Sequence, residues 1–554
     1  MHPIYRIIAL AVAAAFAPTS AQADAVTDWN LKSSELVTEA KLGTPPAVRT
    51  MAIVQTAVYE AVLDVTGPKA TSPNASVDAA VAAAQRATLV KLMPAVQASI
   101  DAAYAAAIAK VADGPAKTAG IATGEKAAAA VFAARAADTV AAESYRPHTA
   151  PGMYVPTAAP AVPTWSQRKP WLLASADQVR PGPPPALGSA EWVRDFNEVK
   201  TIGAKASTQR TPQQTDIARF WDYSLPSIYY GVVQSVAAQP GRTVLDNARL
   251  YAAVAQSMDD ALIAVFDAKY RYNFWRPATA IRNADQDGND ATERDAGWTS
   301  LIDAPMHPEY PSGHSILANA VTSVLRAEVG NGPVPTLSAT SPTAKGAKRE
   351  WTRLDDFATE VSMSRVYGGI HYRTALDTGA AMGRQIGEMA ARRFPSSATL
   401  AAVPESLVPA GEQVVERIAA RGVQVYECRE QPNNGGMAWA FVAPEAALYD
   451  AKGDSAGTHY AGPHWEATDG SKIVGAVKAK ADAPVKGAIP WLLLTTRSVG
   501  SEGRYAGVTS VQRVNTVGGV APAKTCDATN KGAVEKVAYT ADYVLLAKSN
   551  VAAR

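Results

Sequence analysis

The chain has 554 residues, of which 47% are hydrophobic and 19% are charged, and its formal net charge at pH 7 is +2. This length is too great for one ordinary hydrophobic core, so we expect about two to four domains. The near-neutral charge and the lack of a basic run argue against a nucleic-acid partner. Beyond the N-terminal segment no stretch is long and apolar enough to cross a bilayer, so an integral membrane protein is not expected.

Residues 1–23 have the pattern of a secretory signal peptide. Arg6 supplies a weakly positive start, Ile7 to Phe16 form an apolar stretch, and Ala21-Gln22-Ala23 matches an Ala-x-Ala cleavage site. The apolar stretch is shorter than the ~20 residues that a spanning helix needs, which disfavours the alternative of a membrane anchor. We therefore expect a protein that is exported, to the periplasm or beyond the cell.

Helical periodicity dominates the chain after the signal segment. Pro45 and Pro46 mark a helix start, and apolar residues then recur every three or four positions in Ala-rich sequence. Further helices are predicted at about 78–111, 115–141, 189–205, 212–223, 247–269, 314–329, 354–367 and 377–393. A Gly/Pro-rich loop is expected at 330–345.

A Pro-rich segment at 145–187 interrupts this helical pattern. It contains Tyr154, Trp165 and Trp171, whose large rings favour burial. We therefore predict an ordered surface excursion, with a flexible linker as the alternative.

Several polar features nearby have both a structural and a functional interpretation. Asp259 and Asp260 on a predicted helix suggest acid/base carboxylates or a metal pair, but a solvated or locally paired helix face is favoured. The Asp/Asn-rich stretch 283–290 resembles a calcium loop without its closing Glu, so a polar turn is favoured. His307 is either a loop histidine, the favoured interpretation, or a residue at a pocket rim that affects halide handling or proton supply.

Three short runs between residues 269 and 377 contain the side chains suited to binding a tetrahedral oxyanion. They are Lys269-x6-Arg276-Pro277, Pro311-Ser312-Gly313-His314 and Ser364-Arg365-x5-His371. Fixed cations and many donors are what a phosphate or vanadate requires in a dry pocket, and arginine forks bind such oxygens in pairs.

The second run also opens a predicted helix. Backbone N–H groups and the helix dipole near Ser312 and Gly313 favour an anion there, and the lack of a side chain at Gly313 permits close approach. His314 and His371 complete the set, one for proton transfer and one for bonding to the central atom.

Together these motifs resemble the signature of the type 2 phosphatidic acid phosphatase superfamily. The contexts Pro308-Glu309-Tyr310-Pro311 and Tyr367-Gly368-Gly369-Ile370-His371 are most similar to its vanadium-dependent haloperoxidase branch. The resemblance covers roughly residues 24 to 395 and implies a mostly helical, bundle-type catalytic domain over that range.

The resemblance also implies a function and a cofactor. Vanadate would be bonded to the protein through His371 and neutralised by Lys269, Arg276 and Arg365, with Ser312 and Gly313 assisting. His314 would transfer protons while hydrogen peroxide oxidises a halide, without haem or flavin. Phe274 and Trp275 are either an apolar wall for the halide or core aromatics.

Two other functions compete with this interpretation. The same pocket suits an acid phosphatase, in which His371 attacks the phosphorus of a phosphate ester, His314 protonates the leaving group, and no cofactor is required. A binding or envelope protein with a vestigial catalytic fold is the third possibility, and the complete set of cations argues against it.

One position departs from the pattern of many relatives, which carry an Asp four residues after the final histidine. Here that position is Ala375, and the nearest acid is Asp377. A helix turns once every ~3.6 residues, so Asp377 points elsewhere than an i+4 residue would. Asp377 is therefore a candidate to orient His371, and a backbone carbonyl is the alternative.

The period changes from helical to alternating after a linker predicted at 396–410. Strands bounded by Gly, Pro and Asn are predicted at 423–428, 437–442, 491–496, 509–514 and 539–546, in a β-rich domain over 411–554. Gln424-Val-Tyr-Glu-Cys428 and Ile489-Pro-Trp-Leu-Leu-Leu494 resemble an uncharacterised family of secreted domains (DUF3455), which implies no activity.

Side chains in this second domain allow two further predictions. The chain has only two cysteines, Cys428 and Cys526, and a disulfide between them is expected in an exported protein. His459, His464 and Asp469 are weaker candidates for a small-ligand or metal site, because surface loop residues are commoner.

Overall fold

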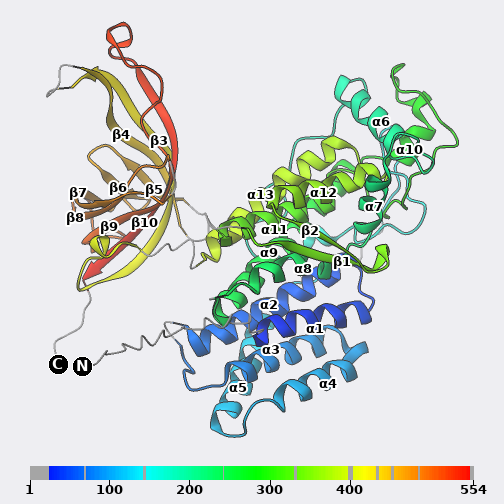
Figure 1. Cartoon of the computed structure of the whole chain (residues 1–554), viewed down its shortest axis with the longest axis horizontal. Coiled ribbons are helices and arrows are strands. Elements are labelled where there is room, and N and C mark those ends of the chain that lie inside the picture. Colours follow the sequence, from blue (N-terminus) through cyan, green and yellow to red (C-terminus); the bar gives the residue numbers. More distant parts are fainter. Residues whose placement is uncertain are drawn as a thin grey trace, which may run out of the picture.

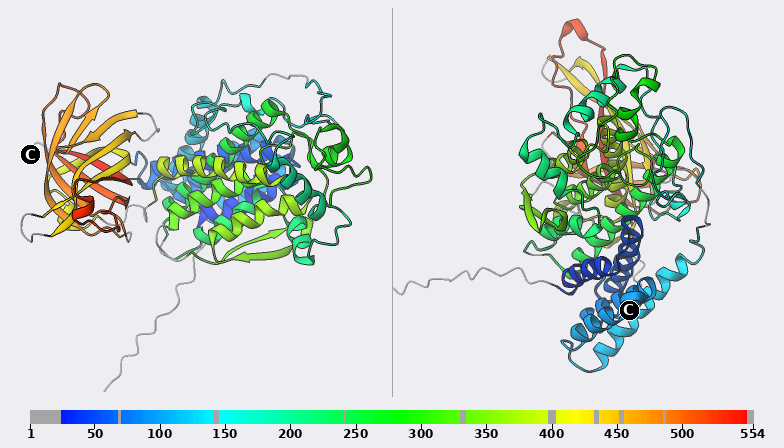
Figure 2. Two further views of the ribbon diagram at one scale, coloured as in Figure 1. Left: turned by 90° about the horizontal axis from the view of Figure 1, so that it is seen from above. Right: turned by 90° about the vertical axis from the view of Figure 1, so that its right-hand side faces the viewer.

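The computed structural model describes residues 24–67, 70–140, 145–240, 242–329, 334–396, 403–431, 436–450, 455–484 and 487–548. The predicted signal peptide and residues 397–402 of the predicted linker lie outside these ranges. A helical domain is followed by a β domain, as the sequence indicates, and the two form separate bodies in Figures 1 and 2.

The helical domain is built from helices that the sequence largely predicts. In chain order they are α1 (Ala25–Glu39), α2 (Thr44–Thr66), α3 (Val77–Leu92), α4 (Gln97–Ile108), α5 (Pro115–Ala134), α6 (Ala190–Ile202), α7 (Pro212–Phe220), α8 (Pro226–Ala237), α9 (Val244–Tyr272), α10 (Pro277–Arg282), α11 (Gly313–Val329), α12 (Leu354–Tyr367) and α13 (Arg373–Arg393).

Two local predictions are wrong. The helix expected at 78–111 is divided into α3 and α4, because Pro94 begins a 3-10 turn and cannot donate an intrahelical hydrogen bond. The loop expected at 330–345 contains strand β1 (Leu337–Ser341), which pairs antiparallel with β2 (Ala347–Trp351). Leu337 faces Trp351 in this hairpin and both are buried, so core packing stabilises the short strands.

Helix α9 lies at the centre of the domain and is buried along most of its length. Helix α13 packs against α11 through a stripe of glycines spaced one helical turn apart. A Cβ atom on Gly379 would lie 2.6 Å from the Ser312 carbonyl oxygen, and a Cβ on Gly383 would lie 2.3 Å from that of Ile316. These glycines therefore permit a backbone approach that brings the start of α13 close to the start of α11.

The Pro-rich segment is ordered where it passes over the helices. Tyr154 and Trp165 are buried, and the N–H of Tyr154 donates to the carbonyl of Asn273 at 2.7 Å. The prediction of an ordered excursion is confirmed for these residues. We call residues 145–175 the strap.

The β domain is an eight-stranded antiparallel barrel closed by pairing of its first and last strands. Its strands are β3 (Glu412–Glu430), β4 (Met437–Tyr449), β5 (Ser455–Tyr460), β6 (His464–Ala467), β7 (Lys472–Ala481), β8 (Trp491–Ser498), β9 (Ser510–Gly518) and β10 (Val534–Lys548). The five predicted strands lie in β3, β4, β8, β9 and β10, whereas β5, β6 and β7 were missed. Apolar and aromatic side chains, among them Trp465, Tyr539 and Tyr543, form a buried core.

A disulfide and a packed segment stabilise the outside of this barrel. Cys428 and Cys526 form the expected disulfide, with an S–S distance of 2.10 Å. Leu407, within the predicted linker, is buried against Trp491 and Val544, and its carbonyl accepts a 2.7 Å hydrogen bond from Gln512 Nε2. Leu407 thus packs as part of the β domain, although the sequence places the start of that domain at residue 411.

None of the helices in the described ranges has both the length and the apolar character needed to cross a membrane.

Candidate active site

The end of α9 and the start of α10 place two cations side by side. Asn273 adopts a left-handed conformation (φ 48°) that ends α9, and Arg276 then takes the N-cap position before Pro277. The buried Lys269 ammonium donates to the carbonyl oxygens of Pro308 and Glu309, at 3.0 and 2.8 Å.

The guanidinium of Arg276 connects the first motif to the third and to the loop at His307. Its Nε donates to the His307 carbonyl at 3.0 Å, and its Nη1 donates to the Ile370 carbonyl at 2.8 Å. The same Nη1 lies 3.2 Å from His371 Nε2. Arg276 is buried, so these contacts fix its fork at the floor of the site.

His371 is held by a buried carboxylate on its other side. Its Nδ1 lies 2.7 Å from Glu309 Oε1, which also accepts the N–H of Tyr372 at 3.0 Å. Arginine can only donate, so the contact with Arg276 assigns the lone pair to His371 Nε2 and the hydrogen to Nδ1. The ring therefore presents an unprotonated Nε2 toward the pocket.

This arrangement corrects the expectation for Asp377. That residue is exposed on α13, where its electrostatic partner is Arg373, and the acid that contacts His371 is Glu309. The helical turn explains the difference, because an i+6 side chain points away from the i+4 direction.

The start of α11 and the end of α12 complete the pocket. Ser312 is buried and its Oγ accepts from the Ser315 hydroxyl at 3.2 Å, while Gly313 is the first residue of α11. Arg365 Nη1 donates to the Trp221 carbonyl at 2.7 Å. The six residues expected to bind the oxyanion, together with His314, therefore converge on one place.

Several buried polar atoms at this place lack a hydrogen-bond partner among the described residues. They are Arg365 Nε, His314 Nε2 and Glu309 Oε2. Unsatisfied buried polar atoms are rare and costly, so two free nitrogen atoms around one pocket indicate space for an oxygen-rich ligand.

Burial and mutual repulsion shift the protonation of the whole site. Burial lowers the pKa of both Arg276 and Arg365 to about 10, and it lowers the pKa of Lys269 strongly, assisted by repulsion from Arg276. The pKa values of His314 and His371 fall well below the ordinary histidine value, first through burial and then through the neighbouring cations. Both imidazoles are therefore neutral near pH 7.

Burial raises the pKa of Glu309 to about 7, although Arg276 and Lys269 oppose that shift. The pocket thus combines excess positive charge with a carboxyl group that titrates near neutrality. Such a site attracts a small polyanion.

His307 lies at this pocket, so the favoured prediction of an ordinary loop histidine is wrong. Its Nδ1 is 3.0 Å from Arg276 Nη2, and its ring contacts Phe266 edge-to-face with centroids 5.3 Å apart. Burial and the nearby Lys269 hold its pKa well below the usual range.

A cavity of about 320 Å³ opens directly above these groups. Lys269, His307, Gly313, His314, Arg365 and His371 form part of its lining. The remaining wall is mostly apolar and includes Pro45, Val162, Leu262, Phe266, Met306 and Leu317.

Phe274 and Trp275 do not line this cavity. They are buried in a separate aromatic cluster with Trp192 and Tyr372, in which the ring centroids of Trp192 and Trp275 lie 5.9 Å apart. The core interpretation of these two aromatic residues is therefore confirmed.

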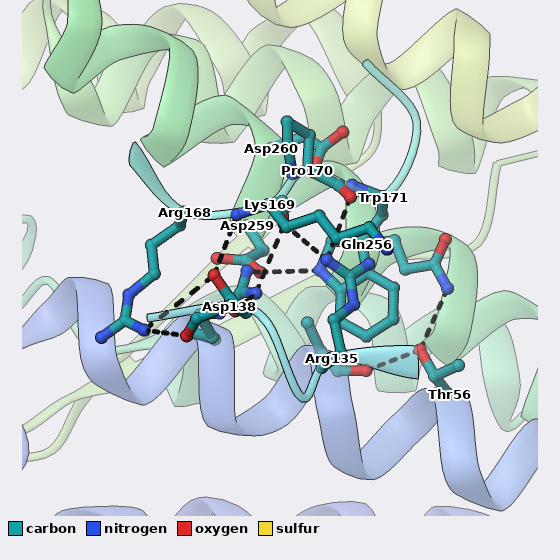
Figure 3. Close-up of polar contacts among 12 residues, drawn as sticks. Thr56, Arg135, Asp138, Arg168, Lys169, Pro170, Trp171, Gln256, Asp259 and Asp260 are labelled. Atoms are coloured by element: carbon teal, nitrogen blue, oxygen red, sulfur yellow. Dashed lines mark hydrogen bonds and ion pairs between the residues drawn. The ribbon is translucent and has the colours of Figure 1, made fainter. Parts of the chain in front are cut away.

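The acidic pair on α9 is buried and paired, so of the favoured prediction of a solvated or locally paired helix face the solvated part is wrong and the paired part agrees with the structure. Asp260 accepts the N–H groups of Trp171, Leu172 and Leu173 at 2.7–2.9 Å. Asp259 pairs with Arg49 at 2.6 Å, and Arg49 also pairs with Asp138. Figure 3 shows Asp138, Lys169 and Trp171 gathered around Asp259 and Asp260, so the pair attaches the strap and the segment before it to α9.

The other candidate sites do not assemble into metal centres. Asp287, in the stretch that resembles a calcium loop, accepts hydrogen bonds from Trp192 and Thr292, as expected of a polar turn. In the barrel, His459 stacks on Trp465, whereas Asp469 accepts from Ser471 and the N–H of Arg504. The described residues contain no group of three or more His, Cys, Asp or Glu side chains placed to bind a metal ion.

The fold and the pocket together define a vanadium-haloperoxidase-like helical domain, joined to a second domain of a different family. Residues 249–398 match the family model of the VCPO second helical-bundle domain, and residues 409–547 match a domain family of unknown function, DUF3455. Both expected resemblances are confirmed.

Comparisons with individual proteins also identify vanadium haloperoxidases as similar to this chain. The chain is 27% identical over 222 residues to a vanadium chloroperoxidase of Curvularia inaequalis, a match that spans 34% of this chain and about a third of that relative. A bacterial vanadium-dependent iodoperoxidase structure is 26% identical, with a TM-score of 0.55, and the match covers 66% of this chain and 94% of that one.

A holo-type bacterial vanadium-dependent chloroperoxidase structure has a TM-score of 0.53 at 16% identity. The match covers 67% of this chain and 94% of the other. At that identity the likeness shows the fold alone.

Proposed function

We propose that this protein is a vanadate-dependent haloperoxidase that uses hydrogen peroxide to oxidise a halide. The observation that carries the proposal is the orientation of His371, whose Nε2 lone pair faces a pocket of three buried cations while Glu309 holds Nδ1. The likeness to vanadium haloperoxidases supports the same function.

The residues of the pocket fit a bound vanadate. Arg365 Nε lacks a partner among the described residues, and a vanadate oxygen would supply an acceptor for it. The free Nε2 of neutral His314 would accept from a protonated ligand oxygen. Lys269, Arg276 and Arg365 would balance the ligand charge, and Ser312 and Gly313 would add donors at the start of α11. Bound vanadate would supply a Lewis acid that activates peroxide without changing its own oxidation state.

The protein's own groups account for the proton transfers. His371 would hold the ligand through Nε2, and Glu309 would maintain its tautomer and raise its basicity. His314 is neutral because burial and Arg365 lower its pKa, so it would accept a proton from incoming peroxide and return it to departing water. His307, held by Arg276, would border the halide.

An acid phosphatase remains the second candidate, because the same lone pair on His371 is suited to attack phosphorus. Arg276 and Arg365 would then stabilise the transferring phosphoryl group, and His314 would have to donate a proton. The likeness to vanadium haloperoxidases supports the peroxidase over the phosphatase.

The test uses the full chain after removal of bound metals. Orthovanadate is titrated in while bromination of a phenolic dye by peroxide and bromide is followed, with hydrolysis of a phosphate ester measured in parallel. We expect bromination that saturates with vanadate and is abolished in His371→Ala. Ester hydrolysis without vanadate, inhibited as vanadate is added, would establish the phosphatase instead, and inactivity in both assays would indicate a vestigial site.

We also propose that the protein is exported. The pattern of residues 1–23 and the disulfide between Cys428 and Cys526 support an oxidising compartment. Expression of the full chain in a Gram-negative host, followed by N-terminal sequencing of the periplasmic product, should give Asp24 as the first residue. Retention of Met1 on a cytoplasmic product would contradict export.

A further inference from the structure

Part of the β domain extends beyond the closed barrel. Strand β5 pairs with β4 only over residues 446–449, and β9 pairs with β10 only from Tyr539 onward. The far ends of β3, β4 and β10 therefore form a three-stranded sheet, which lies above the shorter strands in Figure 1. Within the described ranges, residues 437–445 of β4 and 534–538 of β10 have no neighbouring strand on their outer sides, so they are the two edges of this sheet.

The β4 edge is apolar. Its sequence is Met437-Ala-Trp-Ala-Phe-Val-Ala443, without a charged residue or a proline. Phe441 and Val442 each have 48% of their surface exposed. Unpaired N–H and C=O groups on such an edge pair readily with another extended chain, and natural proteins usually prevent this with charges or proline. A bulge leaves Val442 without a partner on β3, so the regular part of the edge is 437–441.

The β10 edge of the same sheet is protected. Glu535 and Lys536 lie on it, and both form ion pairs. The carbonyl of Ala538 accepts the N–H of Gly519 at 3.0 Å, so part of the backbone of this edge is already satisfied. Charged side chains on an edge strand oppose pairing with a second strand. Of the two edges, the β4 edge is therefore the one suited to bind another chain.

The large side chains of the β4 edge are held in place before any partner binds. Phe441 packs edge-to-face against Tyr426 on β3, with ring centroids 5.9 Å apart. Trp439 Nε1 donates to the carbonyl of Lys524 at 2.8 Å. Because residues i and i+2 of a strand share a face, Trp439 and Phe441 lie on the same side of the sheet. Side chains that are already ordered lose little entropy on binding, which favours association.

The β4 edge is complementary to a second copy of itself. In an antiparallel pair centred on Trp439, Met437 lies opposite Phe441 of the second copy, and Ala438 lies opposite Ala440. Shifting the centre to Ala440 places Trp439 opposite Phe441 instead. Neither register brings two charges together, and both place aromatic residues in cross-strand pairs. A twofold axis uses both apolar edges at once, and the β10 edges are protected, so assembly stops at two copies.

We infer that the β4 edge binds a second copy of this chain, by antiparallel pairing of residues 437–441 across a twofold axis. The two sheets then join into one sheet of twice as many strands. The contact is short compared with the ~1,600 Å² of surface that a typical stable interface buries, so the dimer dissociates on dilution. This inference involves the β domain alone and is independent of the proposed function.

Sedimentation velocity of the full chain over a wide range of concentration measures the association. We expect a monomer that converts to a dimer as the concentration rises. Phe441→Lys places a charge at the paired edge and should weaken the dimer at least about tenfold, since a buried aromatic contact within the interface is lost. Val534→Lys, at a position 56% exposed on the β10 edge of the same sheet, is the matched control and should dimerise like the wild type.

A second measurement needs no variant, which keeps the test valid if a thermal melt shows that Phe441→Lys disturbs the fold. Hydrogen–deuterium exchange of the wild type at low and at high concentration reports on the backbone amides directly. The amides of residues 438–442 should exchange more slowly at high concentration, whereas those of residues 534–538 should not change.

A chain that stays monomeric at every concentration would overturn the inference. So would a dimer that Phe441→Lys and Val534→Lys weaken equally, or one whose concentration-dependent protection lies in the helical domain. Growth beyond the dimer would also overturn it, because the pairing would then not be closed by a twofold axis. Protection of residues 438–442 only after addition of an unrelated extended apolar peptide would assign the edge to a peptide partner and exclude the second copy.

Discussion

Two clusters of buried charge lie in the helical domain, and they differ in the balance between their acidic and basic groups. The cluster shown in part in Figure 3 sets three arginines, Arg49, Arg135 and Arg168, against three acids, Asp138, Asp259 and Asp260. Both oxygens of Asp260 accept backbone N–H groups. The active-site cluster has an excess of cations, and some of its donors lack partners in the described part of the chain. Burial of charge alone therefore does not indicate function, whereas an unbalanced buried charge indicates a missing ligand.

The largest expected effect comes from removing a cation of the unbalanced cluster. Arg365→Ala should weaken vanadate binding at least about 30-fold, since loss of one partner from a buried charge pair costs about 2–5 kcal/mol. Equilibrium dialysis with measurement of bound vanadium gives the affinity. Arg326→Ala, at an exposed ion pair with Asp355, is the control and should bind vanadate like the wild type.

Removing an acid from the balanced cluster should affect stability instead. Asp260→Ala leaves three N–H groups, one of them fully buried, without their acceptor, and we expect the free energy of unfolding to fall by about 3–5 kcal/mol. Urea denaturation measures the change. Asp267→Ala on the same helix, at a more exposed pair with Arg180, should lose no more than about 1 kcal/mol. Equal losses in both variants would show that burial of Asp260 has no special role.

A smaller effect is expected from the residue that positions His371. Glu309→Gln keeps the shape of the side chain but removes its charge, and the affinity for vanadate should fall about 10- to 100-fold, as it does when partners of metal ligands are replaced. Dialysis at pH 8, where Glu309 is ionised, measures this loss. Asp377→Asn is the matched control, and a loss there as large as in Glu309→Gln would restore Asp377 as the orienting acid.

The smallest effect concerns the pH dependence of stability. Burial raises the pKa of Glu309 from its ordinary value of 4.5 to about 7, so between these values the folded protein retains a proton that the unfolded chain releases. Stability contributed by the neutral acid is therefore present below pH 4.5 and is lost as the pH rises toward 7. Glu309→Gln should make this decline shallower by up to about 1.4 kcal/mol per pH unit, measured by urea denaturation of the vanadate-free protein. An unchanged slope would show that Glu309 is already ionised in this range.

The sequence predicted the residues of the pocket because each lies in a short local motif. Lys269, Gly313 and Arg365 could be identified from spacing and resemblance, and the structure places all three in the wall of one cavity. Glu309 was visible beside the second motif, but its partner His371 is 62 residues away, and only the packing of the helices brings the two into contact. No local pattern reports such a contact.

The same limit applies to the fold. The helices and the longer barrel strands follow from periodicity, and the break before α4 could have been inferred from Pro94. The burial of Asp260 could not have been inferred from the sequence, because its role as an acceptor depends on Trp171, which lies 89 residues earlier in the chain. Strands β5 and β6 are short, so their alternation is too brief to identify in the sequence alone.

The glycine stripe on α13 has a consequence for any comparison between relatives of this protein. Gly379 and Gly383 set how closely the backbones of α11 and α13 approach. Ser312 lies directly before α11 and His371 lies just before α13, so this approach also affects the distance between them. A methyl group added at either glycine would change the span available to a bound anion without touching it. Differences in ligand size or affinity among related proteins can therefore arise from small residues on the far side of a helix.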